Sequence, residues 1–136
     1  WFGSSTCSFT VTTPNCKVLY IALETGSSTL GRGQYEWLLE VLSKRDEYRY
    51  CIIITHSNIT YQGFQNGVFT QEETVVLYDL FAKNNVNMII SGHSHRENDV
   101  TIEGVRYVTT GAIKSGEFGT CYVKNAGVDF KFEDLK

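Results

Sequence analysis

The sequence contains no basic block and no run of like charges. Its 12 Lys and Arg residues are outnumbered by 15 Asp and Glu residues, which gives a formal net charge of −3 at pH 7. Proteins that bind nucleic acid through its phosphates concentrate positive charge on one surface, so the composition offers no electrostatic case for a nucleic-acid partner. No apolar run approaches the ~20 residues that a membrane-spanning helix needs, and we therefore expect no membrane span.

The N-terminal residues also lack the features of a signal peptide. Residues 1–5 carry no basic stretch and no long apolar segment. The chain begins with Trp1 rather than Met, so we expect it to have been processed or excised from a longer protein. The sequence does not indicate a cellular compartment.

Cysteine is present but not in a zinc-binding pattern. None of the four cysteines forms a C-x-x-C pair, which argues against a structural zinc site. Cys7 and Cys16 flank a turn at residues 12–15, and the sequence is compatible with either a disulfide across a hairpin or two free thiols there. Cys51 and Cys121 fall in apolar strand patterns and are expected to be small buried residues.

The length of 136 residues predicts a single domain, residues 1–136. A 42% apolar and 20% charged composition is typical of a globular protein with a real core. Up to residue 91 the apolar patterns predict strands separated by helices. Beyond that point they predict short strands only. Strands are expected at 8–11, 17–23, 50–55, 87–91, 100–102, 105–109, 120–123 and 128–132.

Two amphipathic helices are expected between these strands. One spans about 34–47, with Tyr35, Leu38, Leu39 and Leu42 on one face. The other opens with the capping box Thr70-Gln71-Glu72-Glu73, ends near 84–85, and turns Val76, Leu77, Leu80 and Phe81 inward. The pattern predicts an α/β (α+β) fold: a mixed sheet flanked by helices, followed by C-terminal antiparallel strands. The long loop at 56–69 is typical of a functional loop.

All three histidines directly follow apolar strands. His56 comes after the run 51–55, and His93 and His95 come after the run 89–92. In open α/β sheets, ligands and catalytic groups collect beyond the carboxyl ends of the strands. Imidazole is also the commonest neutral metal ligand, so the sequence predicts a metal site.

The spacing of His93 and His95 strengthens this prediction. A lone histidine beside a buried strand is usually a core or surface residue, and two histidines at i, i+2 in a regular strand point to opposite faces. In a loop after Gly92, whose backbone is permissive, both can turn toward one metal or toward two neighbouring metals. We therefore expect His56, His93 and His95 to converge. A three-His zinc site and a share of a two-metal phosphate-hydrolysing site are both compatible with them.

Three nearby polar residues have both a functional and an ordinary interpretation. Asn58 is placed either to donate to a phosphate oxygen or to cap a turn. Arg96 either attracts an anionic substrate or is a solvated loop residue. Glu97 either orients an imidazole or is a solvated charge.

At this point the motifs resemble a known family. Gly92-His93-Ser94-His95 after an apolar strand resembles the G-H-x-H motif of calcineurin-like metallophosphoesterases, and Thr55-His56 resembles the single-histidine motif that precedes it. Residues 20–26 and 33–38 are similar to the strand, small-residue loop and Q-x-x-W-L helix of that family, and 108–112 resembles the segment that closes its site. The resemblance covers nearly the whole chain, with the motifs in the same order.

The resemblance implies two divalent metal ions, Mn, Fe or Zn, at one edge of a β-sandwich. His56 and His93 would bind one ion and His95 the other. The ions would hold a phosphate ester and activate a hydroxide that attacks phosphorus.

The chain departs from the family in one large respect. The family's N-terminal half supplies D-x-H, G-D-x-x-D and G-N-H motifs, and none of the five aspartates here fits one, nor does the chain contain an Asn-His pair. We therefore expect residues 1–136 to be the C-terminal portion of a catalytic domain, half of the sandwich, whose partner is the missing N-terminal half. Three neutral imidazoles cannot hold two dications close together without anions between them, so the isolated chain is expected to be inactive.

The sequence thus predicts that the parent protein hydrolyses phosphate mono- or diesters. The main alternative is a non-catalytic fragment or interaction module with at most one weakly bound metal. A mononuclear three-His hydrolase is a second alternative.

Overall fold

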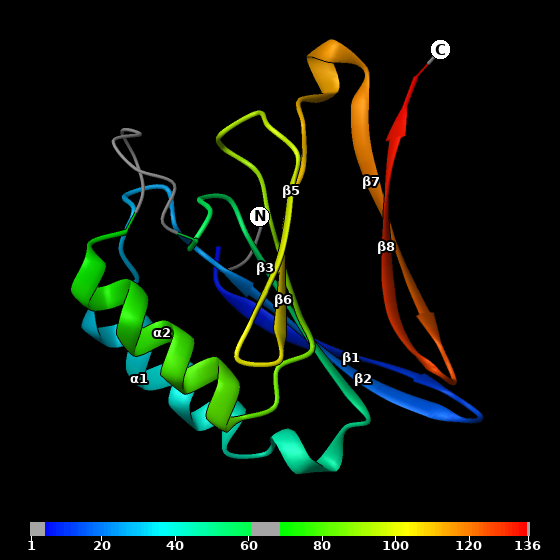
Figure 1. Ribbon diagram of the computed structural model, residues 1–136. Coiled ribbons are helices and arrows are strands. Elements are labelled where there is room, and N and C mark those ends of the chain that lie inside the picture. Colours follow the sequence, from blue (N-terminus) through cyan, green and yellow to red (C-terminus); the bar gives the residue numbers. More distant parts are fainter. Residues whose placement is uncertain (1–4, 61–68, 136) are drawn as a thin grey trace.

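The computed structural model describes residues 5–60 and 69–135, and it forms three layers. A six-stranded mixed sheet lies between two helices on one face and a two-stranded hairpin on the other (Figure 1). The large sheet has the order β1-β2-β3-β4-β6-β5, and the hairpin consists of β7 and β8. The strands are β1 Cys7–Thr13, β2 Cys16–Leu23, β3 Tyr50–Thr55, β4 Met88–Ser91, β5 Asn98–Ile102, β6 Val105–Thr109, β7 Glu117–Lys124 and β8 Gly127–Asp134. The helices are α1 Gly31–Leu42 and α2 Gln71–Lys83, with short 3₁₀ turns η1 Arg45–Glu47 and η2 Ile113–Ser115.

The four central strands run parallel, and most of their residues are buried, as their apolar runs predict. β2, β3, β4 and β6 pair in parallel, whereas β1 and β5 lie antiparallel at the two edges. This mixed sheet with helices and antiparallel strands confirms the predicted fold class. Among the described residues, neither helix has the length and apolar character needed to cross a membrane.

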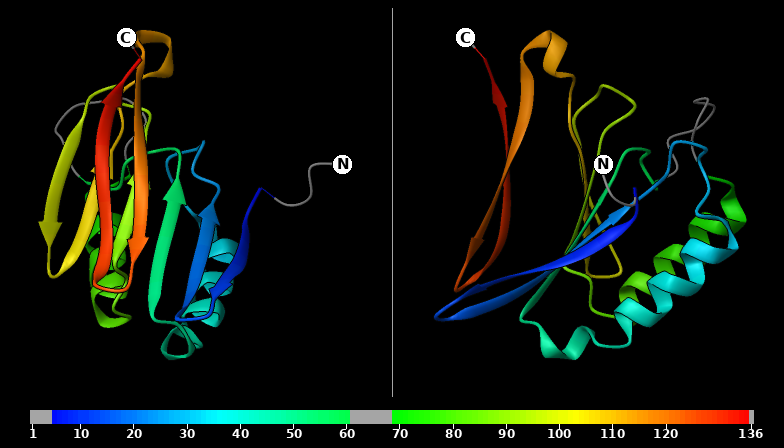
Figure 2. Two further views of the ribbon diagram at one scale, coloured as in Figure 1. Left: turned by 90° about the vertical axis from the view of Figure 1, so that its right-hand side faces the viewer. Right: turned by 180° about the vertical axis from the view of Figure 1, so that it is seen from behind.

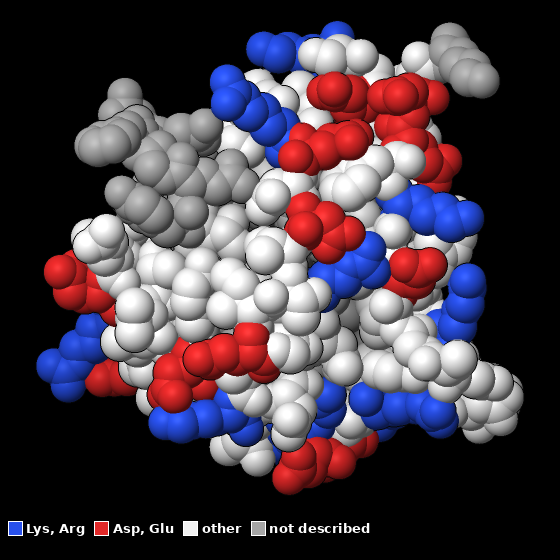
Figure 3. All heavy atoms as spheres, in the orientation of Figure 1, with Lys and Arg blue, Asp and Glu red and all other residues white. Residues whose placement is uncertain are grey.

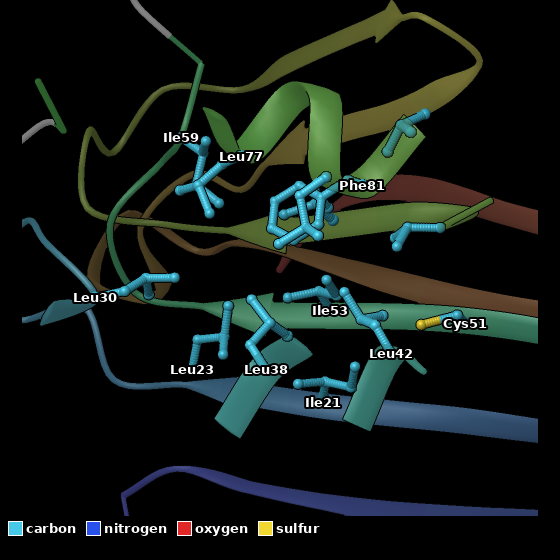
Figure 4. Close-up of a cluster of buried hydrophobic side chains, with 14 of the residues drawn as sticks. Ile21, Leu23, Leu30, Leu38, Leu42, Cys51, Ile53, Ile59, Leu77 and Phe81 are labelled. Carbon is cyan, nitrogen blue, oxygen red and sulfur yellow. The ribbon is translucent and has the colours of Figure 1, made fainter. Parts of the chain in front are cut away.

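The main core lies between the helices and the sheet. Figure 4 shows side chains of α1 and α2 meeting those of β2 and β3 in this layer. Each fully buried Leu, Ile or Phe here contributes about 1.5–3 kcal/mol of transfer free energy. The members with no more than 2% exposure in this layer include Ile21, Leu38, Leu42, Cys51, Ile53, Leu77 and Phe81. Leu39 and Val76, which periodicity placed inward, are more than 40% exposed because each helix contacts the sheet along a narrower stripe.

The first helix ends earlier than predicted. α1 stops at Leu42 and the chain turns through η1 before β3, whereas the pattern indicated a helix to residue 47. Arg45 explains the difference. Its buried guanidinium donates to the backbone oxygens of Tyr48, at 2.6 Å, and Asn85, at 2.8 Å, and to Asn87 Oδ1, at 3.0 Å. In a helical pattern a charged residue is assigned to the exposed face of the helix. The pattern therefore did not indicate that Arg45 lies beyond the end of α1.

The predicted capping box is half formed, and its other half joins the two helices. Thr70 Oγ1 accepts from the Glu73 N–H at 3.2 Å, as a capping box requires. The Glu73 carboxylate does not return to Thr70. It accepts from Leu30 N at 2.8 Å and from Thr29 Oγ1 at 3.1 Å, at the start of α1. The N-termini of α1 and α2 are therefore held together.

The structure excludes a disulfide between Cys7 and Cys16. In the β1–β2 register Cys7 lies opposite Ala22, whereas Cys16 lies opposite Thr13, so the two cysteines are at opposite ends of the hairpin, ~20 Å apart at the usual rise per residue. All four cysteines are free thiols. Cys51 is fully buried as expected, and burial raises its pKa to about 12. Cys121 is only half-buried, contrary to expectation.

The hairpin is fastened to the sheet by one arginine as well as by apolar packing. Met88 and Val108 of the sheet pack against Phe130 of β8. Arg106 on β6 forms a bidentate pair with Asp99 on β5, at 3.0 and 2.7 Å, and reaches Asp129 on β8 at 3.2 Å. A hydrogen bond from the Phe130 N–H, followed by the Arg106 guanidinium, lowers the pKa of Asp129 below its ordinary value.

This contact predicts an acid-sensitive attachment of the hairpin. Because the folded-state pKa of Asp129 is lowered, its stabilisation is complete above the ordinary aspartate range and is lost as pH falls through the folded pKa. Asp129→Asn should lower the thermal midpoint at pH 7 by no more than a few degrees, since the pair is exposed. The difference from wild type should vanish in unfolding scans below the ordinary aspartate range. A difference that persists in acid would contradict the role of the Asp129 charge.

Candidate metal centre

The loops that carry the histidines meet at one edge of the sheet. β2, β3, β4 and β6 are parallel, so the segments that follow them emerge at the same edge, which both views in Figure 2 show. The sequence placed the histidines after buried strands, and the parallel pairing brings those strand ends together. The Gly92 N–H donates to the backbone oxygen of His56 at 3.0 Å, which ties the loop after β4 to the loop after β3.

His56 and His93 are in direct contact. The His56 Nε2 and His93 Nδ1 atoms are 3.1 Å apart, and the rings meet edge to face with their centroids 5.1 Å apart. Between two neutral imidazoles, one of these nitrogens donates and the other accepts. The spacing also suits a shared metal ion. Two ligand nitrogens at about 2.0–2.1 Å from one ion are about 2.8–3.4 Å apart for bond angles of about 90–110°. The donor set and its spacing therefore fit one divalent ion.

The loop after β4 has a strained backbone, and the strain falls on the histidines. His93 and His95 have φ values of 65° and 53°, in the left-handed region that non-glycine residues rarely occupy. The Ser94 N–H donates to the Gly92 oxygen at 2.8 Å, which closes a tight turn around His93. Gly92 itself is not among the residues with positive φ, contrary to the expectation that its freedom shapes the loop. Strain of this kind persists where the surrounding structure enforces it, often at functional sites.

Thr25 holds the backbone at His56, and sequence reasoning missed it. The fully buried Thr25 Oγ1 accepts from the His56 N–H at 3.1 Å and from the Ser57 N–H at 2.9 Å. Because both of its lone pairs are used, its own proton points to Thr55 Oγ1, at 2.7 Å, which in turn donates to the Ser57 oxygen at 3.1 Å. The Ser57 hydroxyl donates to the Thr25 oxygen at 2.8 Å. This hydrogen-bond network fixes the start of the loop after β3. Nothing in the sequence around Thr25 indicated this role, because a threonine after a strand is common.

His95 is exposed and lies beside His93 on a cavity of about 490 Å³. The remaining lining, which forms the wall of the cavity, comes from the segment between β6 and β7 and from the first residues of β7: Thr110, Gly111, Ala112, Ile113, Lys114, Glu117, Phe118 and Gly119. Within residues 5–60 and 69–135, no group of three or more His, Cys, Asp or Glu residues gathers closely enough to hold a metal. Direct contact is therefore established for His56 and His93 only. Metal binding by all three histidines stays a prediction.

The accessory residues do not join this cavity. Asn58 is 1% exposed, and neither atom of its amide group has a hydrogen-bond partner among the described residues, so the expected turn cap is not formed there. Arg96 and Glu97 are exposed beside His95, and the described part of the chain shows no hydrogen bond or ion pair to either. Residues 61–68 of the predicted functional loop lie outside the described residues.

Comparison with known proteins identifies the family. The chain belongs to the calcineurin-like phosphoesterase family, whose model matches residues 10–97 and so includes all three histidines. The fold is similar to that of a putative 5'-nucleotidase from Staphylococcus aureus, solved in complex with alpha-ketoglutarate, with a TM-score of 0.60 and 15% identity over 97% of this chain. It is also similar to GAP50, the anchor in the inner membrane complex of Plasmodium (TM-score 0.59, 16% identity, 95% of this chain). A third similar structure is TT1561 of Thermus thermophilus (TM-score 0.57, 12% identity, 88% of this chain).

This chain matches only part of the length of each of these structures. The chain spans 28%, 43% and 54% of their respective lengths. At these identities the likeness shows the fold alone. No curated protein sequence matches the chain significantly.

Proposed function

We propose that this chain is the C-terminal portion of the catalytic domain of a metal-dependent phosphoesterase that hydrolyses phosphate mono- or diesters with two divalent ions. Membership of the calcineurin-like phosphoesterase family supports the reaction class. The contact between His56 Nε2 and His93 Nδ1, at 3.1 Å beside a cavity, is the observation that carries the proposal for this chain.

The histidines act as ligands in this proposal and not as general bases. His56 Nε2 and His93 Nδ1 would hold one ion, and His95 would hold the second. When bound, such ions orient a phosphate ester and generate a hydroxide nucleophile at neutral pH. Arg96 and Asn58 are retained only as weak candidates for substrate contact, because neither lines the cavity.

The remaining ligands must come from outside the described residues. Neither Glu97 nor Asp99 supplies a bridge, since Glu97 is exposed and Asp99 is paired with Arg106. We propose that the missing N-terminal half of the catalytic domain supplies the anionic ligands and packs on the sheet face that also carries the hairpin.

An uncovered apolar surface supports this packing. Phe9, Val11 and Ile54 are 48%, 43% and 40% exposed, although large apolar side chains in a sheet are usually covered. The strand register places all three on the face that β7 and β8 cover further along. In the left view of Figure 2, which looks onto this face of the sheet, the hairpin does not extend over β1. A second layer that continued from the hairpin would bury these side chains.

The alternative proposal is a non-catalytic fragment or interaction module that binds at most one metal weakly. It is favoured by the lack of any group of three or more His, Cys, Asp or Glu side chains near one point in the described ranges.

Metal content measured together with turnover tests the proposal. The parent protein should carry about two divalent ions and hydrolyse an aryl phosphate, whereas the isolated chain should retain at most one ion and show no turnover. Elemental analysis after dialysis and release of the phenol provide the two measurements. A parent protein that binds no metal and hydrolyses no phosphate ester would establish the module instead.

A further inference from the structure

We propose that the cavity beside His93 and His95 receives the organic group of the ester, and that the wall at 110–119 selects small apolar groups such as an aryl ring. This inference rests on the proposed function, since it names the substrate class of the same site. A cavity of about 490 Å³ is large enough for a small molecule. His93 and His95 line the same cavity, so a phosphate bound at the centre that they help to form would have its ester group beside the wall.

The wall is mainly apolar. Ala112, Ile113 and Phe118 line it, together with Gly111 and Gly119. Ile113 is 68% exposed and therefore does not contribute to the core. An apolar group of a ligand placed against Ile113 and Phe118 would be removed from water where it contacts them, which favours apolar over polar ester groups.

The wall is also preorganised. The Thr110 N–H donates to the Ser91 oxygen at 2.8 Å, which fixes the wall to the strand that precedes the histidines. The Ala112 N–H donates to the Glu117 carboxylate at 3.1 Å, and the Glu117 N–H returns to the Ala112 oxygen at 3.2 Å. A Cβ on residue 111 would lie 2.5 Å from the same carboxylate, so this position requires Gly111. A wall whose shape is set before binding can discriminate between ligands of different shape.

One cation lies in this wall. Among the described residues that line the cavity, Lys114 is the only Lys or Arg, and the same ranges contain no ion pair or hydrogen bond to its ammonium group. The face drawn in Figure 3 mixes basic and acidic side chains and shows no broad basic patch. Lys114 therefore provides local attraction for the phosphate, a role that the sequence assigned to Arg96.

The test compares two substrates of the parent protein. Ile113→Ser should raise KM for phenyl phosphate about tenfold and leave KM for glycerol 2-phosphate within twofold, with kcat unchanged for both. Lys114→Met should raise KM for both substrates about threefold to fivefold and weaken its dependence on salt. Val75→Ser, at a 64% exposed apolar position on α2, and Lys44→Met, at an exposed lysine, are the matched controls and should change neither KM.

Equal KM changes for the two substrates in Ile113→Ser, or none, would overturn the proposed selection by the wall. A binding measurement that needs no turnover separates this result from failure of the proposed function. Phenyl phosphate titrated into methyl-labelled parent protein should shift the Ile113 δ-methyl resonance more than the resonance of any other isoleucine methyl group in residues 1–136. If the parent lacks turnover and this shift is seen, the cavity assignment stands; if phenyl phosphate binds without it, the assignment is wrong.

Discussion

Replacing His93 in the parent protein should abolish metal binding at the shared position and lower phosphate-ester turnover by at least about a hundredfold. His93 is the only described residue whose ring contacts His56, so its loss removes half of the one ligand pair that the structure assembles. His93→Ala and His93→Asn should behave alike. Asparagine tolerates the left-handed backbone that this position adopts, so agreement between the two assigns the effect to the imidazole and not to the turn.

Ser94→Ala is the matched control for this experiment. The buried Ser94 hydroxyl has no hydrogen-bond partner among the described residues, so its removal should cost little stability and leave metal content intact. Elemental analysis and turnover of an aryl phosphate are the measurements for all three variants. Unchanged turnover in His93→Asn would refute the ligand assignment.

Replacing Thr25 with valine should weaken both the fold and the site. Valine keeps the shape of the side chain but removes the acceptor for the His56 and Ser57 N–H groups. Each buried amide that loses its partner costs about 1–3 kcal/mol, so with two such amides the free energy of unfolding should fall by about 2–6 kcal/mol. Because the loop then holds His56 less firmly beside His93, metal affinity should fall about tenfold, as it does when partners that orient ligands are removed.

Thr25→Ser separates the hydrogen bonds from the packing. Serine retains the oxygen that accepts both amides but lacks the methyl group, so its stability loss should be smaller, about 1 kcal/mol, and its metal affinity should stay near that of wild type. Chemical denaturation and metal titration of the parent protein give the two quantities. Equal metal affinity in the valine and serine variants would show that the Thr25 hydroxyl does not position His56.

Much of the fold follows from local patterns. The apolar runs at 17–23 and 50–55 correspond to β2 and β3, because strands covered on both faces exclude polar residues on either side. Thr70 caps α2 as its spacing from Glu73 predicts. Periodicity did not show where α1 ends, since burial of Arg45 depends on the Asn85 backbone oxygen and on Asn87 Oδ1, some 40 residues away.

The site was predicted less completely than the fold. The positions of His56 and His93 at strand ends followed from the sequence, and so did their likeness to the family motifs. Their convergence was expected as well, but not the direct ring contact, because that contact requires β3 and β4 to be parallel neighbours and depends on a left-handed turn that falls on His93 and not on Gly92. The role of Thr25 could not be predicted for the same reason: its hydrogen bond to the His56 N–H links residues more than 30 positions apart, which are neighbours only because β2 and β3 pair.

The sequence by itself determined the class of this protein: the buried strands, the order of the helices and the three histidines that place it among the calcineurin-like phosphoesterases. Only the tertiary structure decided which imidazoles touch, which residue holds the backbone at His56, and that Lys114 rather than Arg96 lines the cavity. The physical reason is the range of the interactions. Backbone propensity and apolar periodicity depend on a few neighbouring residues and can therefore be predicted from the sequence. A site is formed by side chains that meet only after distant strands have paired.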